Sequence, residues 1–291
     1  MLNFILSENC HLVNHGSAYF CNMIKLILPA LVLLISISAC NNQDHTNKTG
    51  STGATSATGR EKTLLDSIAS FPDFAVLKEN LIQFYRDSAE YDKALAVAND
   101  ALQKDSTNDK LWEIKATLFF ENEDTLNAIR SFETALRLNP TPRYLVLLGS
   151  LYAQTKNSRA IQIADTLLSS KIPEAAEKAF FIKGLYFNFT GDKNKAIGFL
   201  DKSLLIDHMD MLAYRERGIA LYDMGKYEDA LAVLKKAVTL QNNFDEGYYW
   251  LGRCYEKLNK PTEAFEAYKT ALLYSPDYVE ATDALKRLNT K

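Results

Sequence analysis

Between Asp245 and Tyr278, apolar and small residues fall into two short runs that have the spacing of helix faces. The first run, at i, i+3, i+4 and i+7, consists of Tyr248, Leu251, Gly252 and Tyr255. The second run consists of Ala264, Tyr268 and Ala271. Asn259 separates the runs, and Pro276 ends the second because a prolyl residue has no N–H to donate to a helix. The pattern predicts two helices of roughly 13 residues each, which need tertiary packing to be stable in water.

The same pattern recurs upstream at an interval of 34 residues. Gly184, Gly218 and Gly252 are separated by this interval. One copy is irregular, since Gly149 lies 33 residues after its counterpart upstream and 35 residues before Gly184. Six units then cover residues 75–278. Because no unit can hold its two helices alone, we expect the units to stack on one another.

These units resemble the tetratricopeptide repeat, whose pattern is an aromatic residue, Leu-Gly, Tyr, then Ala, an aromatic residue, Ala and Pro. In the last unit these positions are Tyr248, Leu251, Gly252, Tyr255, Ala264, Tyr268, Ala271 and Pro276. The resemblance implies an all-α fold, a right-handed α-solenoid of six helix-turn-helix repeats. Residues 279–291 are expected to form a capping helix, because Lys286 stands where the repeats have glycine and leaves a polar outer face.

Glycine recurs at two places in the repeats for different physical reasons. Glycine inside a helix costs about 0.5–1 kcal/mol relative to alanine, so a glycine in each first helix predicts a close approach of the second helix. The glycines of this kind are Gly149, Gly184, Gly218 and Gly252. Gly191 and Gly225 stand where the first helix ends, and a left-handed residue is expected there. Asn259 takes the same place in the last repeat and tolerates the same conformation.

The N-terminal region carries a second signal. Lys25 precedes an apolar run of 12 residues, Leu26–Ile37, which is shorter than the roughly 20 residues of a membrane-spanning helix. The run fits a secretory signal. Residues 37–40 read Ile-Ser-Ala-Cys and resemble the lipobox of bacterial lipoproteins, so residues 23–39 are expected to be a signal peptide and Cys40 to receive lipid. The alternative is a plain secretory signal with an incidental cysteine. Residues 1–22 do not look like part of a signal, and we expect translation to start at Met23.

Two segments lie between the signal and the repeats. Residues 41–62 are rich in Thr, Gly, Ser and Asn, and such a composition cannot bury enough apolar surface to fold. Residues 40–62 are therefore expected to comprise the lipidated cysteine and a flexible tether, residues 41–62, that spans roughly 25 Å. Residues 63–74 follow as a lead-in helix, in which Leu64, Leu65 and Ile68 share one face.

Composition and motifs argue against several classes of function. The formal net charge is −3, and no stretch is strongly basic, so nucleic-acid binding is not expected. After removal of the signal only His45 and His208 remain, and no metal-binding, nucleophile or phosphate-loop motif occurs. Cys254 stands beside Tyr255 and fits a small core residue better than a nucleophile. We therefore predict no catalysis, no metal and no cofactor.

The resemblance implies a concave groove lined by the second, fifth, ninth and twelfth residue of each first helix. In the fourth, fifth and sixth repeats these are Lys178, Phe181, Leu185 and Asn188, then Leu212, Arg215, Ile219 and Tyr222, then Glu246, Tyr249, Arg253 and Glu256. We select Lys178, Phe181, Asn188, Arg215, Tyr222, Tyr249 and Arg253 as candidate partner-binding residues, because aromatic residues beside arginines anchor partners. Leu185 and Ile219 are equally consistent with packing against neighbouring helices. Glu79 and Gln83 replace the Lys and Asn of the clamp for chaperone tails, so that class of partner is not expected.

Two functional classes fit these observations. The first is a non-catalytic protein-binding adaptor, held in the bacterial cell envelope by a lipid anchor and facing the periplasm or the cell surface. The second is a lipoprotein that binds a glycan or another small ligand on its groove aromatics. Larger sugar-capturing proteins with such repeats carry long insertions, whereas the spacings here stay within 33 to 35 residues. This regularity favours the adaptor, with a protein partner.

Overall fold

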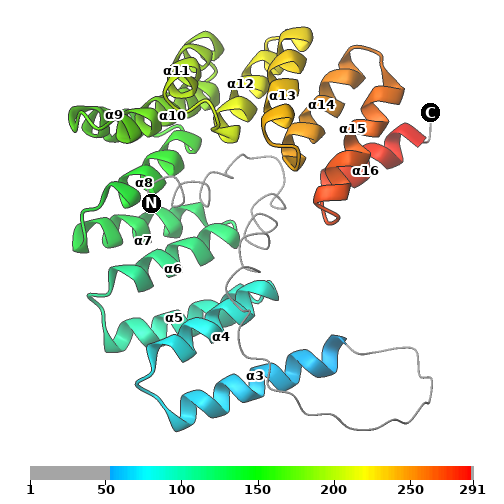
Figure 1. Cartoon of the computed structure of the whole chain (residues 1–291). Coiled ribbons are helices and arrows are strands. Elements are labelled where there is room, and N and C mark those ends of the chain that lie inside the picture. Colours follow the sequence, from blue (N-terminus) through cyan, green and yellow to red (C-terminus); the bar gives the residue numbers. More distant parts are fainter. Residues whose placement is uncertain (1–52, 290–291) are drawn as a thin grey trace, which may run out of the picture. The chain divides into compact units, whose positions relative to one another are not determined.

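The computed structural model describes residues 53–289, and within this range every regular element is an α-helix (Figure 1). The helices are α3 (Gly53–Ser70), α4 (Ala75–Asp87), α5 (Tyr91–Lys104), α6 (Asp109–Glu121), α7 (Thr125–Leu138), α8 (Pro142–Gln154), α9 (Arg159–Ser169), α10 (Pro173–Thr190), α11 (Lys193–Ile206), α12 (Met211–Asp223), α13 (Tyr227–Leu240), α14 (Asp245–Lys257), α15 (Pro261–Tyr274) and α16 (Val279–Asn289). The all-α prediction is confirmed.

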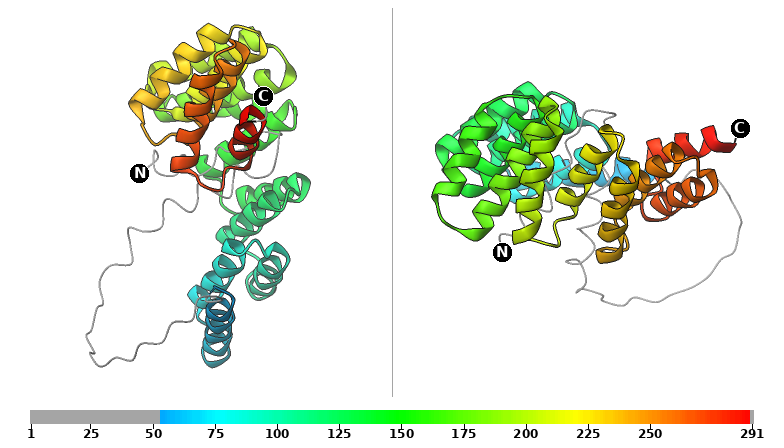
Figure 2. Two further views of the ribbon diagram at one scale, coloured as in Figure 1. Left: turned by 90° about the vertical axis from the view of Figure 1, so that its right-hand side faces the viewer. Right: turned by 90° about the horizontal axis from the view of Figure 1, so that it is seen from above.

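The six predicted repeats correspond to six helix pairs, from α4–α5 to α14–α15, and α16 follows the last pair. Helices divide between two compact units, α3–α7 and α8–α16, which are described separately. Within each unit every helix packs against the next one along the chain, as two further views show (Figure 2). The predicted stacking of helix-turn-helix pairs is confirmed. The first helix of the fourth repeat, α10, begins at Pro173, one turn before the predicted start at Glu177.

In the unit α3–α7, buried side chains of α4, α5 and α6 form a core around Leu81, Ile82 and Leu118. Leu64 and Ile68 of α3 pack against this core, as their shared face predicts. However, α3 begins at Gly53, ten residues before the predicted lead-in helix.

Residues 53–62 are therefore helical and do not belong to a flexible tether. The polar side chains of Arg60 and Glu61 find partners on α4, which composition alone does not reveal. The Arg60 guanidinium lies 5.8 Å from the centre of the Phe84 ring, and Glu61 accepts a 2.8 Å hydrogen bond from the Tyr85 hydroxyl. The other N-terminal predictions, namely the start at Met23, the signal peptide over residues 23–39, Cys40 and the tether up to residue 52, lie outside the described residues.

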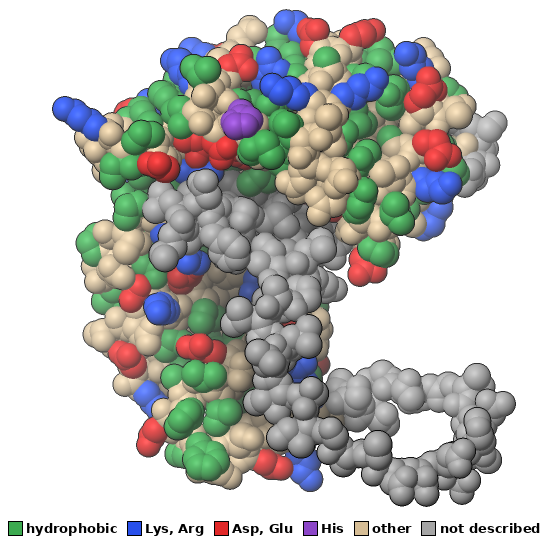
Figure 3. Space-filling view, in the orientation of Figure 1, with side chains coloured by type: hydrophobic (Ala, Val, Ile, Leu, Met, Phe, Trp, Pro, Cys, Tyr) green, Lys and Arg blue, Asp and Glu red, His purple; other side chains and the backbone are tan. Residues whose placement is uncertain are grey.

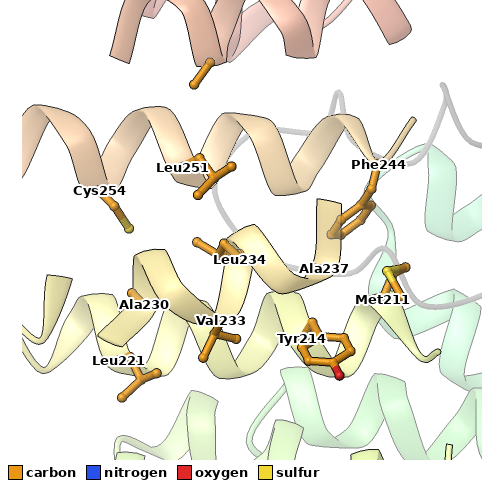
Figure 4. Close-up of a cluster of buried hydrophobic side chains, with 11 residues drawn as sticks. Met211, Tyr214, Leu221, Ala230, Val233, Leu234, Ala237, Phe244, Leu251 and Cys254 are labelled. Atoms are coloured by element: carbon orange, nitrogen blue, oxygen red, sulfur yellow. The ribbon is translucent and has the colours of Figure 1, made fainter. Parts of the chain in front are cut away.

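In the unit α8–α16, a hydrophobic cluster lies where α13 is packed between α12 and α14 (Figure 4). Leu234 of α13 points toward Leu251 of α14, while Tyr214 and Met211 line the cluster from α12. Cys254 belongs to the same cluster and is fully buried, as expected of a small core residue. Burial raises the pKa of its thiol to about 12.

The predicted close approach at the helical glycines is confirmed. A Cβ atom on Gly218 would lie 2.8 Å from Leu234 Cγ, and one on Gly252 would lie 2.5 Å from Tyr268 Cε1. In both repeats the side chain against the glycine is large and comes from the second helix. The glycine therefore makes room for a bulky neighbour, and the second helices contribute Leu234 and Tyr268 as the fillers.

The predicted left-handed turns are also confirmed, and they extend to every repeat. Gly191, Gly225 and Asn259 have φ angles of 94°, 74° and 56°. The equivalent residues of the first three repeats have φ angles of 55°, 63° and 57° and are Ala89, Glu123 and Lys156. The six positions repeat the spacings of 34, 33, 35, 34 and 34 residues seen in the sequence. The turn between paired helices is thus conserved in geometry even where the residue is not glycine.

Over residues 53–289, none of the helices is both long and apolar enough to cross a membrane.

Candidate functional site

The candidate site lies on the first helices of the last three repeats. Helix α10 contacts α12, and α12 contacts α14, in addition to their neighbours along the chain. The second helices α11, α13 and α15 make no comparable contact with one another. First helices therefore lie closer together than second helices, and their side chains reach from one repeat to the next.

Arg215 of α12 is the centre of a buried ion cluster. Its Nη1 donates to Glu246 Oε2 of α14 at 2.7 Å, and its Nη2 donates to Glu216 Oε1 at 2.8 Å. All three side chains are at most 5% exposed. Two carboxylates on a single guanidinium satisfy its charge and join the fifth repeat to the sixth.

A second set of polar contacts joins the fourth repeat to the fifth. Asn188 of α10 donates through Nδ2 to Glu216 Oε2 at 3.0 Å and accepts from Lys193 Nζ at 2.6 Å. Lys193 also donates to Asp223 Oδ2 at 2.6 Å. Because Glu216 takes part in both sets, a continuous chain of hydrogen bonds runs from α10 through α12 to α14.

Glu177 of α10 is a buried carboxyl with several partners. Its Oε1 accepts from the Ser203 hydroxyl at 2.9 Å, and its Oε2 lies 2.9 Å from Lys178 Nζ. Lys178 also reaches Asp210 Oδ2 at 3.4 Å. Burial raises the pKa of the Glu177 carboxyl to about 8, and Lys178 opposes this shift while Asp210 adds to it. Two carboxyls thus compete for one ammonium group.

An aromatic cluster surrounds Arg253 of α14. The Arg253 Cζ atom lies 5.2 Å from the ring centres of both Tyr222 and Trp250 and 5.8 Å from that of Tyr249. Nη1 donates to the Tyr249 hydroxyl at 3.1 Å, and Nη2 donates to the Tyr222 hydroxyl at 3.3 Å. The Tyr249 ring continues into Tyr268 and Tyr278, at centroid distances of 5.6 and 5.1 Å. This arrangement fixes the guanidinium between three rings.

Asn188 and Arg215 contact a neighbouring first helix, and Tyr222, Tyr249 and Arg253 contact one another, but the seven predicted groove residues lie at different depths. Phe181 is 1% exposed and packs in the core, while Asn188, Arg215 and Tyr249 are also buried. Lys178, Tyr222 and Arg253 are partly exposed. The side chains of Leu185 and Ile219 are buried, which supports the packing role considered for them.

Sequence reasoning missed several members of these clusters. Trp250 stands one position outside the groove pattern, and the adjacent Tyr249-Trp250 pair was the signal that could have found it. Glu216 stands next to Arg215 and completes two clusters at once. Neither position is predicted by a rule based on residue spacing alone.

One face of the described molecule shows side chains of mixed character. On the face in Figure 3, Lys and Arg side chains alternate with Asp and Glu side chains over the helices, and hydrophobic side chains lie between them. Such mixed charge is typical of a solvated surface.

Comparisons with known proteins agree with the repeat pattern. Sequence profiles of the tetratricopeptide repeat match residues 115–176, 218–259 and 245–278. Human Superkiller complex protein 3 is 26% identical over 227 residues, which is 73% of this chain but 14% of that protein. The peroxisomal targeting signal receptor of Kluyveromyces lactis is 21% identical over 67% of this chain and 35% of its own length. The chain therefore spans well under half of these relatives.

Solved structures show the same fold. A tetratricopeptide repeat protein from Parabacteroides merdae aligns with a TM-score of 0.67 at 22% identity, covering 82% of this chain and 94% of the other. PilW, a type IV pilus biogenesis factor, aligns with a TM-score of 0.55 at 20% identity, covering 74% of this chain and 98% of the other. At such identities the likeness shows the fold alone.

Proposed function

Since this chain is a tetratricopeptide repeat protein, we propose that it is a non-catalytic scaffold that binds a segment of a partner protein along α10, α12 and α14. Tetratricopeptide repeat domains bind protein partners, and proteins built of them generally act as scaffolds. The partner is bound on the side where the first helices approach one another.

The observation that carries the proposal is the partly exposed group formed by Tyr222, Trp250 and Arg253. These residues come from two neighbouring first helices, α12 and α14. Their rings and guanidinium are already held by mutual contacts, so little side-chain entropy is lost when a partner binds. Aromatic and arginine side chains of this kind supply most of the binding energy in many protein interfaces.

A sugar ligand is a weaker alternative on the same residues. Stacking on a sugar needs a free ring face, and the Arg253 guanidinium lies against the rings of both Tyr222 and Trp250. The buried polar clusters below them, centred on Arg215, position the first helices rather than offer donors to a ligand.

The test compares partner recovery by single variants in a crosslinking pull-down from native membranes. Tyr222→Ala and Trp250→Ala are each expected to lower affinity by about thirtyfold, the usual effect of truncating a central aromatic residue. Lys235→Ala is the control, because Lys235 is exposed on the second helix α13. All variants must show unchanged thermal unfolding. Equal recovery by the groove variants and the control would contradict the proposal.

We further propose that Cys40 carries lipid and holds the scaffold at a membrane of the bacterial cell envelope. The support is the sequence alone: Lys25, the apolar run Leu26–Ile37 and the small residues before the cysteine. Wild type is expected in the detergent-extracted membrane fraction and labelled by palmitate, and Cys40→Ser in the soluble fraction and unlabelled. If the two proteins fractionate and label alike, the anchor proposal is wrong and the scaffold proposal is unaffected.

A further inference from the structure

Arg215 and Arg253 lie on neighbouring first helices, but carboxylates of the described residues pair only with Arg215 of these two. Arg215 is buried between two carboxylates, those of Glu216 and Glu246. Arg253 donates only to the hydroxyls of Tyr249 and Tyr222, and no carboxylate of residues 53–289 lies within ion-pair distance of it. A guanidinium stays charged at any physiological pH. Arg253 therefore presents a positive charge that the described part of the protein does not neutralise.

Two carboxylates near this group in the sequence, one after Arg253 and one after Tyr222, are already engaged. Glu256, one turn after Arg253 on α14, accepts from the Tyr268 hydroxyl at 2.5 Å and from Arg287 Nη2 at 2.7 Å. Asp223, next to Tyr222, accepts from Lys193 at 2.6 Å. Neither carboxylate is therefore paired with Arg253.

Arg253 also keeps free donors and an accessible edge. A guanidinium has five N–H groups, and two of those of Arg253 are used by the phenol hydroxyls. The rings of Tyr222 and Trp250 lie against the group, and all three side chains are partly exposed. The remaining N–H groups match the two oxygens of a carboxylate, and the ring edges match an apolar side chain beside it.

We propose that Arg253 is the docking point for an Asp or Glu side chain on the partner segment, with an apolar neighbour of that residue packed on Tyr222 and Trp250. This inference rests on the scaffold function proposed above and names the chemistry of the partner. We choose a side chain rather than a chain end because Arg253 lies inside α14. The backbone N–H groups there bond within the helix and cannot form a backbone nest for a terminal carboxylate.

The experiment selects binders from a random peptide library, in which each peptide is fused through its C-terminus to a phage coat protein, so that no free chain end is offered. The target is the full chain in detergent. Selected peptides are expected to be enriched in Asp or Glu beside an aromatic or aliphatic residue. Changing that acid to its amide, or changing Arg253→Gln, is expected to lower affinity by about tenfold.

The two changes together are expected to lower affinity no further than either one alone, because they remove the same contact. Arg217→Gln is the matched control, since Arg217 pairs with Asp201 and is not in the aromatic cluster. Arg253→Lys keeps the charge but not the two-pronged geometry, and intermediate affinity is expected. If Arg253→Gln does not fold, the affinity of Arg253→Lys tests the proposal in its place.

The outcomes separate the two proposals. Binders that lose affinity with Trp250→Ala but carry no acidic residue would overturn the inference and leave the scaffold function standing. Additive effects of the amide change and Arg253→Gln would also overturn it, because the two charges would then act at different places. A library that yields no binder sensitive to Trp250→Ala or Tyr222→Ala would contradict the scaffold function on these helices and the inference with it.

Discussion

Glu123 has a φ angle of 63° in the turn between α6 and α7, where three of the other five repeats have glycine or asparagine. A side chain in this conformation costs roughly 1–2 kcal/mol, and glycine avoids most of that cost. Glu123→Gly is therefore expected to raise the free energy of unfolding by about 1 kcal/mol, measured by urea denaturation. Gly225→Ala, with φ of 74°, is the reciprocal change and should lower it. A loss of stability in both variants would contradict the argument.

Glu177 should make stability depend on pH. Its pKa is raised from 4.5 to about 8 in the folded protein by burial, so between these values the folded state holds a proton that the unfolded state has released. Its contribution to stability is therefore fully present below pH 4.5 and is lost as the pH rises to about 8.

Glu177→Gln keeps the size of the side chain and an oxygen that accepts hydrogen bonds, but it cannot ionise. The slope of stability against pH between 4.5 and 8 is expected to become less negative in this variant, by up to about 1.4 kcal/mol per pH unit. Urea denaturation over that range measures it. Asp210 and Lys178, which face Glu177, are the same in both proteins, so the comparison isolates the effect of Glu177. Identical slopes would mean that Glu177 is ionised in the folded state.

Residue-level prediction from the sequence succeeded where a single residue type answers a backbone requirement. The residue types of Gly191, Gly225 and Asn259 predict left-handed turns. Glu123 has the same conformation, although its residue type does not predict it. For Arg215, spacing predicts a groove residue that binds a partner, whereas its side chain is buried. Its burial depends on two carboxylates, one from its own helix and one from the next, and spacing carries no information about such pairing.

At the scale of the helix, the glycines in first helices set the distance between paired helices. Gly218→Leu would place atoms inside the space of Leu234, whose Cγ lies 2.8 Å from the added Cβ position. Overpacking of this kind typically costs about 1–3 kcal/mol. Because each repeat contacts only its neighbours, amide hydrogen exchange should rise in α10–α15 while α4–α6 keep their protection. A uniform rise over all described helices would contradict nearest-neighbour packing.

Gly198 is the matched control for this experiment. It lies inside α11, and a Cβ atom there would have no neighbour within 4 Å. Gly198→Ala is expected to raise stability by about 0.5–1 kcal/mol, since only the helical preference changes. The two glycines are chemically the same and differ in their surroundings, so opposite signs would assign the effect of Gly218→Leu to contact with Leu234.

The starts of most helices were predicted well because the regular spacing of the repeats fixes where each helix begins. The starts of α12 at Met211 and α14 at Asp245 coincide with the predicted repeat boundaries. The two boundaries that differ, at Gly53 for α3 and Pro173 for α10, lie where the sequence departs from the repeat pattern. There, helix formation depends on contacts with neighbouring helices, as those of Arg60 and Glu61 with α4 illustrate.

At the scale of the whole molecule, α16 closes the apolar end of the last repeat. Ala281 and Ala284 of α16 are buried against the cluster that contains Tyr268. Removing residues 279–291 is expected to lower the urea midpoint of α14–α15 and to increase binding of a hydrophobic dye, because the apolar face of α15 becomes exposed. Fluorescence of Trp250 in a Trp112→Phe background reports on this repeat alone, since the chain has two tryptophans. An unchanged midpoint would mean that α16 does not act as a cap.

The polar contacts between first helices also restrict how such a chain can evolve by rearranging its repeats. If the fifth and sixth repeats were exchanged, Glu246 would follow the fourth repeat and face Phe181 instead of Arg215, because Phe181 and Arg215 hold the same position in their repeats. A buried carboxylate without a partner is strongly destabilising. Repeats with the same backbone are therefore not interchangeable modules here, and their order is encoded in pairs of charges that fit only their present neighbours.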